Sequence, residues 1–345
     1  MKWSIQINGK HYNNENLLSI GDSEIRDFLE EWGNKELSIS VKTSGSTDKP
    51  KLINLLKSDM IASAELTGKY FKLENKQTAL LCLPVKYIAG KMMLVRAIVL
   101  GLNLISVKPS SNPIIDCVQS INFAAMTPMQ VNTVLNQSPD KLNLIRQLII
   151  GGAPVGRLLE SKLQEFKTHC YSTYGMTESI THIAVKRLNG ENKSKYFEAL
   201  PNITFQLNKD DCLVINTPHL SCLTIATNDI SKITSKQHFN WIGRLDNVIN
   251  SGGIKLHPEE LETKVSFKFE NTRFFFSSLP DILQGERLVL VIESLNNIHD
   301  LEASLEKLLD RFEMPKKIFY IDSFIETKTG KIDRNKSLES VLNCP

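Results

Sequence analysis

The sequence predicts an α/β protein, in which a large N-terminal α/β domain with a β-rich subdomain precedes a small C-terminal α+β domain. Between residues 39 and 172, short apolar runs typical of buried strands alternate with segments of helical period. After Tyr171 the apolar runs follow one another with few helical signals, and beyond Arg244 helical segments return between strands. Strands that alternate with helices form parallel sheets, so the first half is predicted to contain a largely parallel sheet.

Five strands are expected in the first half, each a short run rich in Leu, Ile, Val or Ala. They span residues 37–41, 78–84, 102–107, 122–128 and 146–152. Helical period is clear at 58–71 and 155–166, and Ser58 is a candidate N-cap for the first of these helices.

The second half is expected to begin with strands only. The β-rich runs span residues 181–188, 203–208, 211–217 and 222–227. The last hundred residues then predict helices at 258–265 and 300–312 and strands at 272–280, 286–294 and 316–322. Pro258 suits the first turn of its helix, where the missing N–H is harmless. A unit of about 100 residues is an ordinary size for a separate domain.

Composition excludes several classes of protein. The 41 Lys and Arg against 38 Asp and Glu leave a net charge of +3, too small to attract nucleic acid. The six cysteines are scattered, without metal-ligand spacing, and are expected to be reduced, mostly buried thiols of a cytoplasmic protein. The N-terminus lacks the apolar core of a secretory signal, and the longest apolar run, 92–107, is too interrupted to cross a membrane.

The stretch SVKTSGSTDKPKLI, residues 40–53, is a candidate phosphate-binding loop. A P-loop needs a second glycine five residues after Gly45 and a hydroxyl seven residues after it, but Pro50 and Leu52 stand there. A dinucleotide-binding loop needs further glycines that are absent. What remains is a hydroxyl-rich loop with Lys49 and Lys51, which can surround a polyphosphate but which, taken alone, is more often a solvated turn.

Four later stretches support the functional interpretation. They are IIGGAPV (149–155), YSTYGMTES (171–179), WIGRLDNVINSGGIKLHPEELE (241–262) and TKTGKIDR (327–334). With the loop at 40–53, their order and spacing resemble the acyl-adenylate-forming (AMP-binding) superfamily, which includes acyl- and aryl-CoA ligases, adenylation domains of peptide synthetases and luciferases. The resemblance covers roughly residues 39 to 335. Within the superfamily, the segment YIAGKMMLVRAIV (87–99) looks most like the short bacterial o-succinylbenzoate–CoA ligases of menaquinone biosynthesis.

This resemblance implies an acid–thiol ligase that uses ATP, Mg²⁺ and coenzyme A. In the family reaction a carboxylate attacks the α-phosphorus of ATP to give acyl-AMP and pyrophosphate, and the thiol of CoA then displaces AMP. The expected partners are therefore small molecules, with no nucleic acid and no membrane insertion; a homo-oligomer is compatible with the sequence.

The resemblance also assigns roles to individual residues. Phosphate binding falls to Thr43, Ser44, Gly45, Ser46, Thr47 and Lys51, with Thr177 as a further phosphate contact. Contacts to adenine and the acyl group fall to Gly151, Gly152, Ala153, Pro154, Tyr174 and Gly175, and contacts to the ribose fall to Asp229 and Arg244. Glu178 would bind Mg²⁺, which needs only one or two carboxylates when phosphate oxygens complete its shell. Lys331 would be the catalytic cation that bridges the carboxylate and the α-phosphate.

Domain boundaries follow from the same resemblance. Residues 1–243 would form the large ATP- and acyl-binding domain, 244–246 a hinge centred on Asp246, and 247–345 a mobile catalytic lid. In the family the small domain swings between the two half-reactions. The segment expected to approach CoA contains Ser251, Gly252, Gly253 and Lys255.

The acyl substrate is the least determined part of this interpretation. Tyr87 stands where the family often has a histidine. Lys91, or Lys86 nearby, is a candidate contact for the second carboxylate of o-succinylbenzoate, although Lys91 is as readily explained as a solvated lysine. Another aryl- or acyl-CoA ligase and a carrier-loading adenylation enzyme remain alternatives. Asp48 and Asn228 replace glycines of the family pattern, so a non-catalytic nucleotide-binding homologue is a third alternative.

Overall fold

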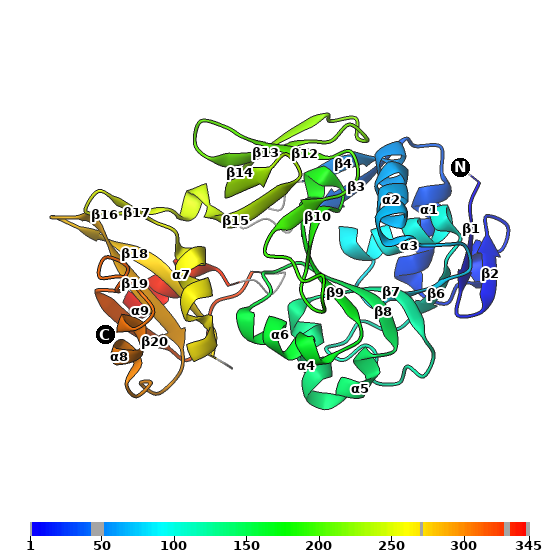
Figure 1. The fold of residues 1–345 in the computed structure, drawn as a ribbon. Helices are drawn as coiled ribbons and strands as arrows, with labels where there is room; N and C mark the ends of the chain where they lie inside the picture. The colour runs from blue at the N-terminus through cyan, green and yellow to red at the C-terminus, as the bar shows by residue number, and fades with distance from the viewer. Residues whose placement is uncertain (1, 43–51, 270–271, 328–331, 343–345) are drawn as a thin grey trace.

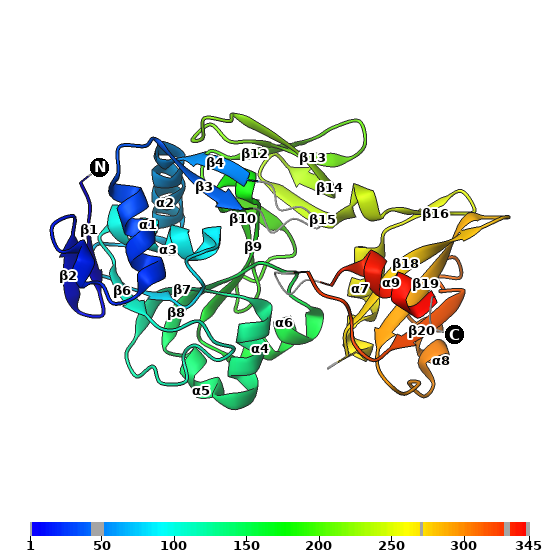
Figure 2. The same cartoon turned by 180° about the vertical axis from the view of Figure 1, so that it is seen from behind.

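The computed structural model describes residues 2–42, 52–269, 272–327 and 332–342. Figures 1 and 2 show two units that each have their own sheet, with the N-terminus in one and the C-terminus in the other. The chain passes from the large sheet to the smaller one between Arg244 and Ile249. The predicted hinge, 244–246, lies in this passage.

The large sheet has thirteen strands among the described residues, in the order β12-β13-β14-β15-β11-β10-β9-β8-β7-β5-β6-β1-β2. Its parallel part consists of β1 (Ser4–Ile7), β5 (Thr78–Leu81), β6 (Asn103–Ser106), β7 (Ile121–Met126), β8 (Ile145–Ile150) and β9 (His169–Gly175). An antiparallel strand, β2 (Lys10–Asn13), closes this side. The fold class and the parallel sheet predicted for the first half are confirmed.

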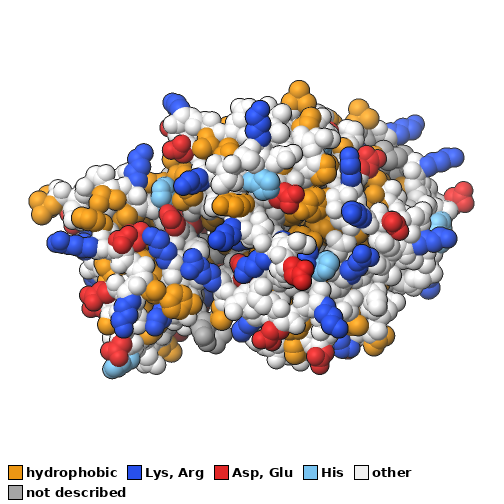
Figure 3. Space-filling model, viewed as in Figure 1, with side chains coloured by type: hydrophobic (Ala, Val, Ile, Leu, Met, Phe, Trp, Pro, Cys, Tyr) orange, Lys and Arg blue, Asp and Glu red, His pale blue; other side chains and the backbone are white. Residues whose placement is uncertain are grey.

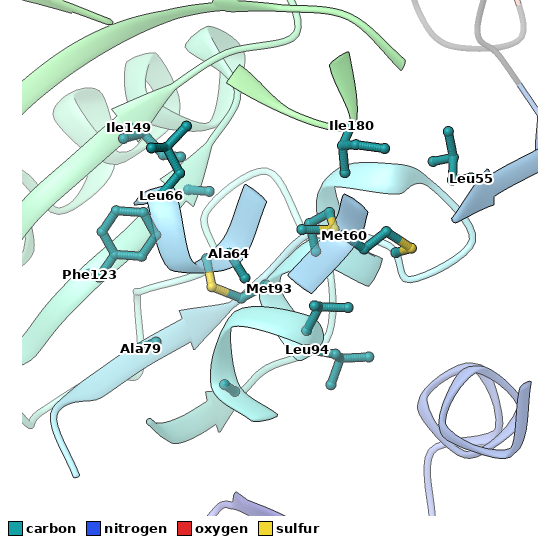
Figure 4. Close-up of a cluster of buried hydrophobic side chains, with 14 of the residues drawn as sticks. Leu55, Met60, Ala64, Leu66, Ala79, Met93, Leu94, Phe123, Ile149 and Ile180 are labelled. Carbon is teal, nitrogen blue, oxygen red and sulfur yellow. The ribbon is translucent and has the colours of Figure 1, made fainter. Parts of the chain in front are cut away.

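Helices cover both faces of the parallel strands, which explains the successive apolar residues in β5 and β7. One face carries α1 (Ser23–Gly33), α2 (Lys57–Phe71) and α3 (Ile88–Leu100); the other carries α4 (Pro128–Gln137), α5 (Pro139–Leu142) and α6 (Arg157–Lys162). Successive strand residues enter different cores: Phe123 packs with the first set of helices and Ala124 with the second. Figure 4 shows the first core, where Phe123 and Ile149 of the sheet meet Leu66 of α2.

The β-rich half extends the same sheet with antiparallel strands. These are β10 (His182–Arg187), β11 (Phe197–Ala199), β12 (Thr204–Leu207), β13 (Cys212–Asn216), β14 (Thr224–Ser235) and β15 (His238–Arg244). The strand expected at 222–227 is longer than predicted, because β14 and β15 form a hairpin whose pairing continues through the polar residues after Thr227.

One expected strand lies outside the large sheet. The run at 37–41 forms β3 (Ser38–Lys42), which pairs antiparallel with β4 (Leu52–Leu56) in a separate two-stranded sheet. A short apolar run does not reveal the orientation of its partner, so the sequence alone could not distinguish this hairpin from a parallel strand.

The small unit contains a five-stranded sheet of β16 (Ile249–Ser251), β17 (Ile254–Leu256), β18 (Phe274–Asp281), β19 (Gly285–Glu293) and β20 (Lys317–Ile321). Its helices are α7 (Pro258–Val265), α8 (Leu301–Glu306) and α9 (Arg334–Leu342). Single 3₁₀ turns complete the described chain: Leu17–Ser19, Leu163–Glu165, Thr177–Ser179, Leu245–Asn247 and Ser266–Lys268. The helix predicted at 300–312 is shorter than expected: α8 ends at Glu306.

Two further expectations can be compared with the structure. The five cysteines within the described ranges are free thiols, and all but Cys222 are buried. Across those ranges no helix combines the length and apolar character that a bilayer crossing requires. Figure 3 shows basic and acidic side chains interspersed over one face of the molecule, in keeping with the small net charge.

Candidate active site

Three parallel strands end at the same level of the large sheet. Register pairs Met126 with Ile150 and Ile150 with Ser172, so the residues that follow β7 and β8 lie beside the last residues of β9. Ligand sites of α/β sheets form beyond such carboxyl ends. The predicted segments GGAP and YGMTES are therefore brought together by the sheet itself.

A side chain at Gly151 would collide with Thr173 of the neighbouring strand β9. A Cβ atom on Gly151 would stand 2.4 Å from the Thr173 hydroxyl oxygen, which itself donates a hydrogen bond to the Ile150 carbonyl. Gly152 adopts a φ of +87°, a backbone conformation that favours glycine. Ala153 and Pro154, which follow, are exposed. The segment can thus bring bare backbone close to a ligand.

Asp229 is the centre of a buried polar cluster. Its carboxylate accepts hydrogen bonds from the Tyr174 hydroxyl at 2.6 Å and from the Trp241 indole N–H at 3.2 Å, and Arg244 Nη1 lies 3.6 Å away. Burial and the neighbouring Asp229 carboxylate both raise the pKa of Tyr174, so the phenol stays protonated as the donor. Two hydrogen-bond donors and the Arg244 guanidinium therefore surround this carboxylate and fix its orientation.

The Tyr174 ring is also held by aromatic neighbours. It makes an edge contact with Phe239, with ring centroids 5.0 Å apart, and a tilted contact with Phe197 at 5.9 Å. A ring fixed at its edge and through its hydroxyl is oriented before any ligand arrives, which lowers the entropic cost of binding.

Arg244 joins this cluster to the predicted hinge. Its Nη2 donates to Asp246 at 2.9 Å while Nη1 faces Asp229, so one half-buried guanidinium connects a buried and an exposed carboxylate. Asn228 Nδ2 also lies 3.4 Å from Asp246 Oδ1. Of the expected site residues, the structure thus brings Tyr174, Asp229, Arg244 and Asp246 into one connected group.

The junction with the small unit is close-packed. Glu259 of α7 is buried, accepts a hydrogen bond from Asn247 Nδ2 at 2.5 Å, and its second oxygen has no hydrogen-bond partner among the described residues. A Cβ on Gly243 of β15 would stand 2.5 Å from that second oxygen. Helix α7 therefore reaches the large sheet through a position without a side chain.

Thr177 and Glu178 lie on a tight turn between β9 and β10. A Cβ on Gly175 would stand 2.3 Å from the Thr181 carbonyl oxygen, so the turn folds back directly on the strand. Glu178 is exposed and makes no hydrogen bond or ion pair with any described residue, so its carboxylate is available to a cation. The described ranges contain no group of three or more metal-binding side chains, so a cation at Glu178 would take its other ligands from a bound phosphate and water.

The two residues expected at the acyl substrate have different surroundings. Tyr87 is half-buried and directly precedes α3, whose first turn packs so closely that a Cβ on Gly90 would stand 2.4 Å from the Pro84 carbonyl oxygen. Lys91 Nζ instead forms an ion pair with Glu31 of α1 at 3.2 Å and lies 4.7 Å from the Phe28 ring centroid. For Lys91 to meet a substrate carboxylate, that ion pair would have to open.

The segment expected to approach CoA forms the hairpin of β16 and β17. Gly252 and Gly253 have φ values of +60° and +82°, and Ser251 and Lys255 flank them in the two strands. Figures 1 and 2 place this hairpin at the end of the small unit that faces away from the large sheet. This arrangement does not bring it to the Asp229 cluster.

The other expected residues belong to the phosphate-binding loop and to the segment around Lys331. Thr43, Ser44, Gly45, Ser46, Thr47, Lys51 and Lys331 lie outside the described residues. Sequence reasoning missed Trp241, whose role depends on the β14–β15 register that pairs it with Ser231, two residues from Asp229. It also missed the buried Arg96, in a helix whose apolar sequence gave no sign of a polar contact.

Comparison with known proteins agrees with this geometry. The AMP-binding enzyme family matches residues 23–217. A 2-succinylbenzoate–CoA ligase of Lactococcus lactis is 24% identical over 335 residues, covering 90% of this chain and 72% of the relative, and that of Haemophilus influenzae is 25% identical, with coverages of 85% and 68%.

Two solved structures show the same fold. An AMP-forming acyl-CoA synthetase/AMP-acid ligase II-like protein from Dyadobacter fermentans is 32% identical, with a TM-score of 0.63 and coverages of 99% of this chain and 100% of that one. The O-succinylbenzoate coenzyme A synthetase of Bacillus subtilis, solved with ATP and magnesium, has a TM-score of 0.74 at 18% identity, covering 87% of this chain and 69% of that one. The protein therefore belongs to the AMP-binding enzyme family, as the order of its motifs predicted.

Proposed function

We propose that the protein is an ATP-dependent acid–CoA ligase that acts through an acyl-AMP intermediate, with o-succinylbenzoate as its acid. The observation that carries the proposal is the Asp229 cluster, in which Tyr174 and Arg244 are held by one buried carboxylate beside the end of β9. The names of the curated relatives in Lactococcus and Haemophilus support the choice of acid.

Residues of this chain have proposed roles in each half-reaction. In the first, a carboxylate oxygen of the acid attacks the α-phosphorus of ATP, an acyl–O–P bond forms, and the bond to pyrophosphate breaks. Tyr174 would pack against adenine, and Asp229 would accept hydrogen bonds from the ribose hydroxyls while Arg244 donates to them. Positioning and charge neutralisation dominate phosphoryl-type transfers, so these fixed side chains act mainly by orientation.

The exposed Glu178 would hold Mg²⁺ together with phosphate oxygens, and the ion would neutralise charge on the departing pyrophosphate. The proposal also assigns a bridging role to Lys331 and phosphate contacts to Thr43, Ser44, Gly45, Ser46, Thr47, Lys51 and Thr177.

In the second half-reaction the CoA sulfur attacks the acyl carbon and AMP leaves. Rotation about 244–246 would bring Ser251, Gly252, Gly253 and Lys255 to the CoA.

The test is ATP- and Mg²⁺-dependent pyrophosphate release, measured with and without CoA. The acids are o-succinylbenzoate, benzoate, a medium-chain fatty acid and mixed amino acids. Preference for o-succinylbenzoate with a CoA thioester as product is expected. Preference for an amino acid would indicate a carrier-loading enzyme instead, and absence of release with every acid would remove the ligase proposal.

Lys331→Ala separates the two half-reactions. Because Lys331 is proposed to act only on the carboxylate and the α-phosphate, the variant should lose adenylate formation by about 100-fold or more while largely retaining thioester formation from preformed acyl-AMP. Equal loss of both half-reactions would contradict the assignment of Lys331 to the first alone.

A further inference from the structure

An ion-pair network lies on the chain that leads to Lys331. Arg273, which directly precedes β18, donates from Nε to Glu293 Oε2 at 2.6 Å and from Nη2 to Glu293 Oε1, while its Nη1 donates to Glu326 Oε1. Glu293 ends β19, and Glu326 stands five residues before Lys331. The Arg273 guanidinium carbon also lies 5.6 Å from the centroid of the buried Phe324 ring. One guanidinium therefore joins the small sheet to the chain that precedes Lys331.

The second acid of this network is not needed to neutralise the arginine. Glu293 already accepts two of the Arg273 donors on its two oxygens, which is the strong paired geometry between a guanidinium and a carboxylate. Glu326 places a second negative charge at the same guanidinium, and its side chain is 41% exposed. Ion pairs with this exposure contribute little to stability. The contact made by Glu326 is therefore better explained by the position it gives to the chain than by the stability it adds.

Backbone contacts join the chain before Lys331 to the chain after it. Glu326 and Ile332 form an antiparallel bridge, and the Asp333 N–H donates to the Ile325 carbonyl at 2.8 Å. Five residues, Lys331 among them, stand between the two bridge residues in the sequence. A chain segment whose ends are held together has fewer accessible conformations than one with free ends. The bridge formed by Glu326 and Ile332 is thus the base of the Lys331 segment.

The far side of this base is held by a second arginine. Arg334, the first residue of α9, donates from Nη2 to Glu262 of α7 at 2.8 Å, and its guanidinium carbon lies 5.7 Å from the Phe275 ring centroid. In both Figures 1 and 2 the described chain that follows β20 extends from the small unit towards the large one. The base is therefore fixed to the small unit on both sides.

We propose that Arg273 and Glu326 are positioning residues that hold Lys331 in place for adenylate formation. Neither residue touches the reacting groups, and both act through Lys331. Because a displacement of about 1 Å can cost about 100-fold in rate, a contact that adds little stability has a large kinetic effect when it fixes a catalytic side chain. Thioester formation, in which Lys331 has no proposed role, does not depend on the pair. The inference rests on the proposed ligase function and adds these two residues to its first half-reaction.

The test is Glu326→Ala, with the two half-reactions assayed separately. Pyrophosphate release measures adenylate formation, and conversion of preformed acyl-AMP measures thioester formation. Adenylate formation should fall by about tenfold or more and thioester formation by less than about twofold. Glu326→Gln should recover part of the loss, because the amide oxygen still accepts a hydrogen bond from Arg273. Equal losses in the two half-reactions would overturn the inference.

A double variant shows whether Glu326 acts through Lys331. In a protein that already carries Lys331→Ala, Glu326→Ala should change adenylate formation by less than about twofold, because the side chain that it positions is absent. Losses that multiply would overturn the positioning role. Full adenylate formation by Lys331→Ala alone would instead remove the proposed role of Lys331, and the inference with it.

The control is Lys193→Ala, which removes an ion pair of matching exposure from the large unit. Lys193 is 44% exposed and pairs with Glu160 at 2.9 Å, and Glu160 keeps Lys186 as a second partner at 3.7 Å. The variant should leave the ratio of the two half-reaction rates unchanged. Lys193→Ala and Glu326→Ala should each lower Tm by less than about 3 °C. The same change in rate ratio for both variants would overturn the inference.

Trypsin digestion tests the anchoring without turnover. Trypsin cleaves after lysine, and mass spectrometry can compare cleavage after Lys328 and Lys331 with cleavage elsewhere in the same chain. Glu326→Ala should speed cleavage at these two positions by about fivefold, and Lys193→Ala should not. Unchanged cleavage would overturn the anchoring even if activity fell. No pyrophosphate release by the wild type with any acid would overturn the proposed function, while the cleavage rates would still decide whether Glu326 holds the segment.

Discussion

Tyr174→Phe isolates one hydrogen bond of the Asp229 cluster. The substitution removes the hydroxyl that donates to Asp229 Oδ2 at 2.6 Å and keeps the ring that packs against Phe239 and Phe197. Trp241 still donates to the other carboxylate oxygen. The variant therefore leaves one oxygen of a buried carboxylate without its donor and changes little else.

The expected cost follows from this geometry. A hydrogen bond to a charged group contributes about 1.5–3 kcal/mol, and leaving a buried acceptor unpaired places the loss within that range. With Asp229 only 7% exposed, water cannot readily replace the phenol, so we expect about 2 kcal/mol of lost unfolding free energy. The KM for ATP should rise by less than about tenfold, because the aromatic surface offered to adenine is retained.

Urea unfolding followed by tryptophan fluorescence measures this loss. All three tryptophans belong to the large unit, with Trp32 in α1, Trp241 in β15 and Trp3 directly before β1, so the signal reports on the part that contains Asp229. The matched control is Tyr70→Phe, which removes a hydroxyl that donates to Glu198 at 3.3 Å with an exposed acceptor. That control should cost less than about 1 kcal/mol.

A Tyr174→Phe variant that loses no more stability than Tyr70→Phe would refute the reasoning. In that case the 2.6 Å contact would contribute no more than a surface hydrogen bond, and Asp229 would be held by Trp241 and Arg244 alone.

Three further predictions concern other positions. Burial raises the pKa of Glu262 to about 7 from 4.5. Between those two pH values the folded protein therefore binds more protons than the unfolded chain. The free energy of unfolding should consequently fall by up to about 3 kcal/mol as the pH rises through that window. Glu262→Gln should remove this dependence in urea unfolding at pH 5 and pH 8; an unchanged slope would show that another group titrates. Gly151→Ala should raise the KM for ATP by about tenfold, because its Cβ must displace the Thr173 hydroxyl, whereas Gly156→Ala, with open space around it, should have no such effect; similar kinetics for the two would contradict the close approach at 151. Lys91→Ala should cost less than about 1 kcal/mol in unfolding free energy, as for other partly exposed ion pairs, and a tenfold or larger rise in KM for o-succinylbenzoate would show that Lys91 contacts the acid after all.

The fold class could be predicted from the sequence because buried strands are recognisable as short runs of apolar residues. In the run at 146–152, the three residues Leu148, Ile149 and Ile150 are apolar at successive positions, which is typical of a strand covered on both faces. The helical period between such runs predicts the parallel connection. The order of the motifs was equally visible, and the sheet register accounts for their meeting at one edge. Local sequence patterns were therefore sufficient to predict the architecture and the approximate position of the site.

Contacts between distant residues were not visible in the same way. Lys91 finds Glu31 sixty positions away, a pairing that depends on how α1 packs against α3 rather than on either local sequence. Arg96 interrupts an apolar helix, and a single arginine there suggests a solvated position because arginine is seldom fully buried. Trp241 reaches Asp229 only through the register of a long hairpin. Tertiary packing decides each of these cases.

The missing side chain at Gly243 has a consequence for the timing of the catalytic cycle. The Glu259 oxygen that has no hydrogen-bond partner among the described residues lies against this glycine, so the two units are close-packed at the point about which rotation is proposed. A methyl group at position 243 would collide with Glu259 and so disfavour this arrangement of the two units, without contacting the reacting groups. Under the proposed two-step cycle, Gly243→Ala would shift the conformational equilibrium and thereby change which step limits turnover. Under that proposal, the hydrogen atom that stands in place of a side chain at Gly243 would set the balance between the two arrangements.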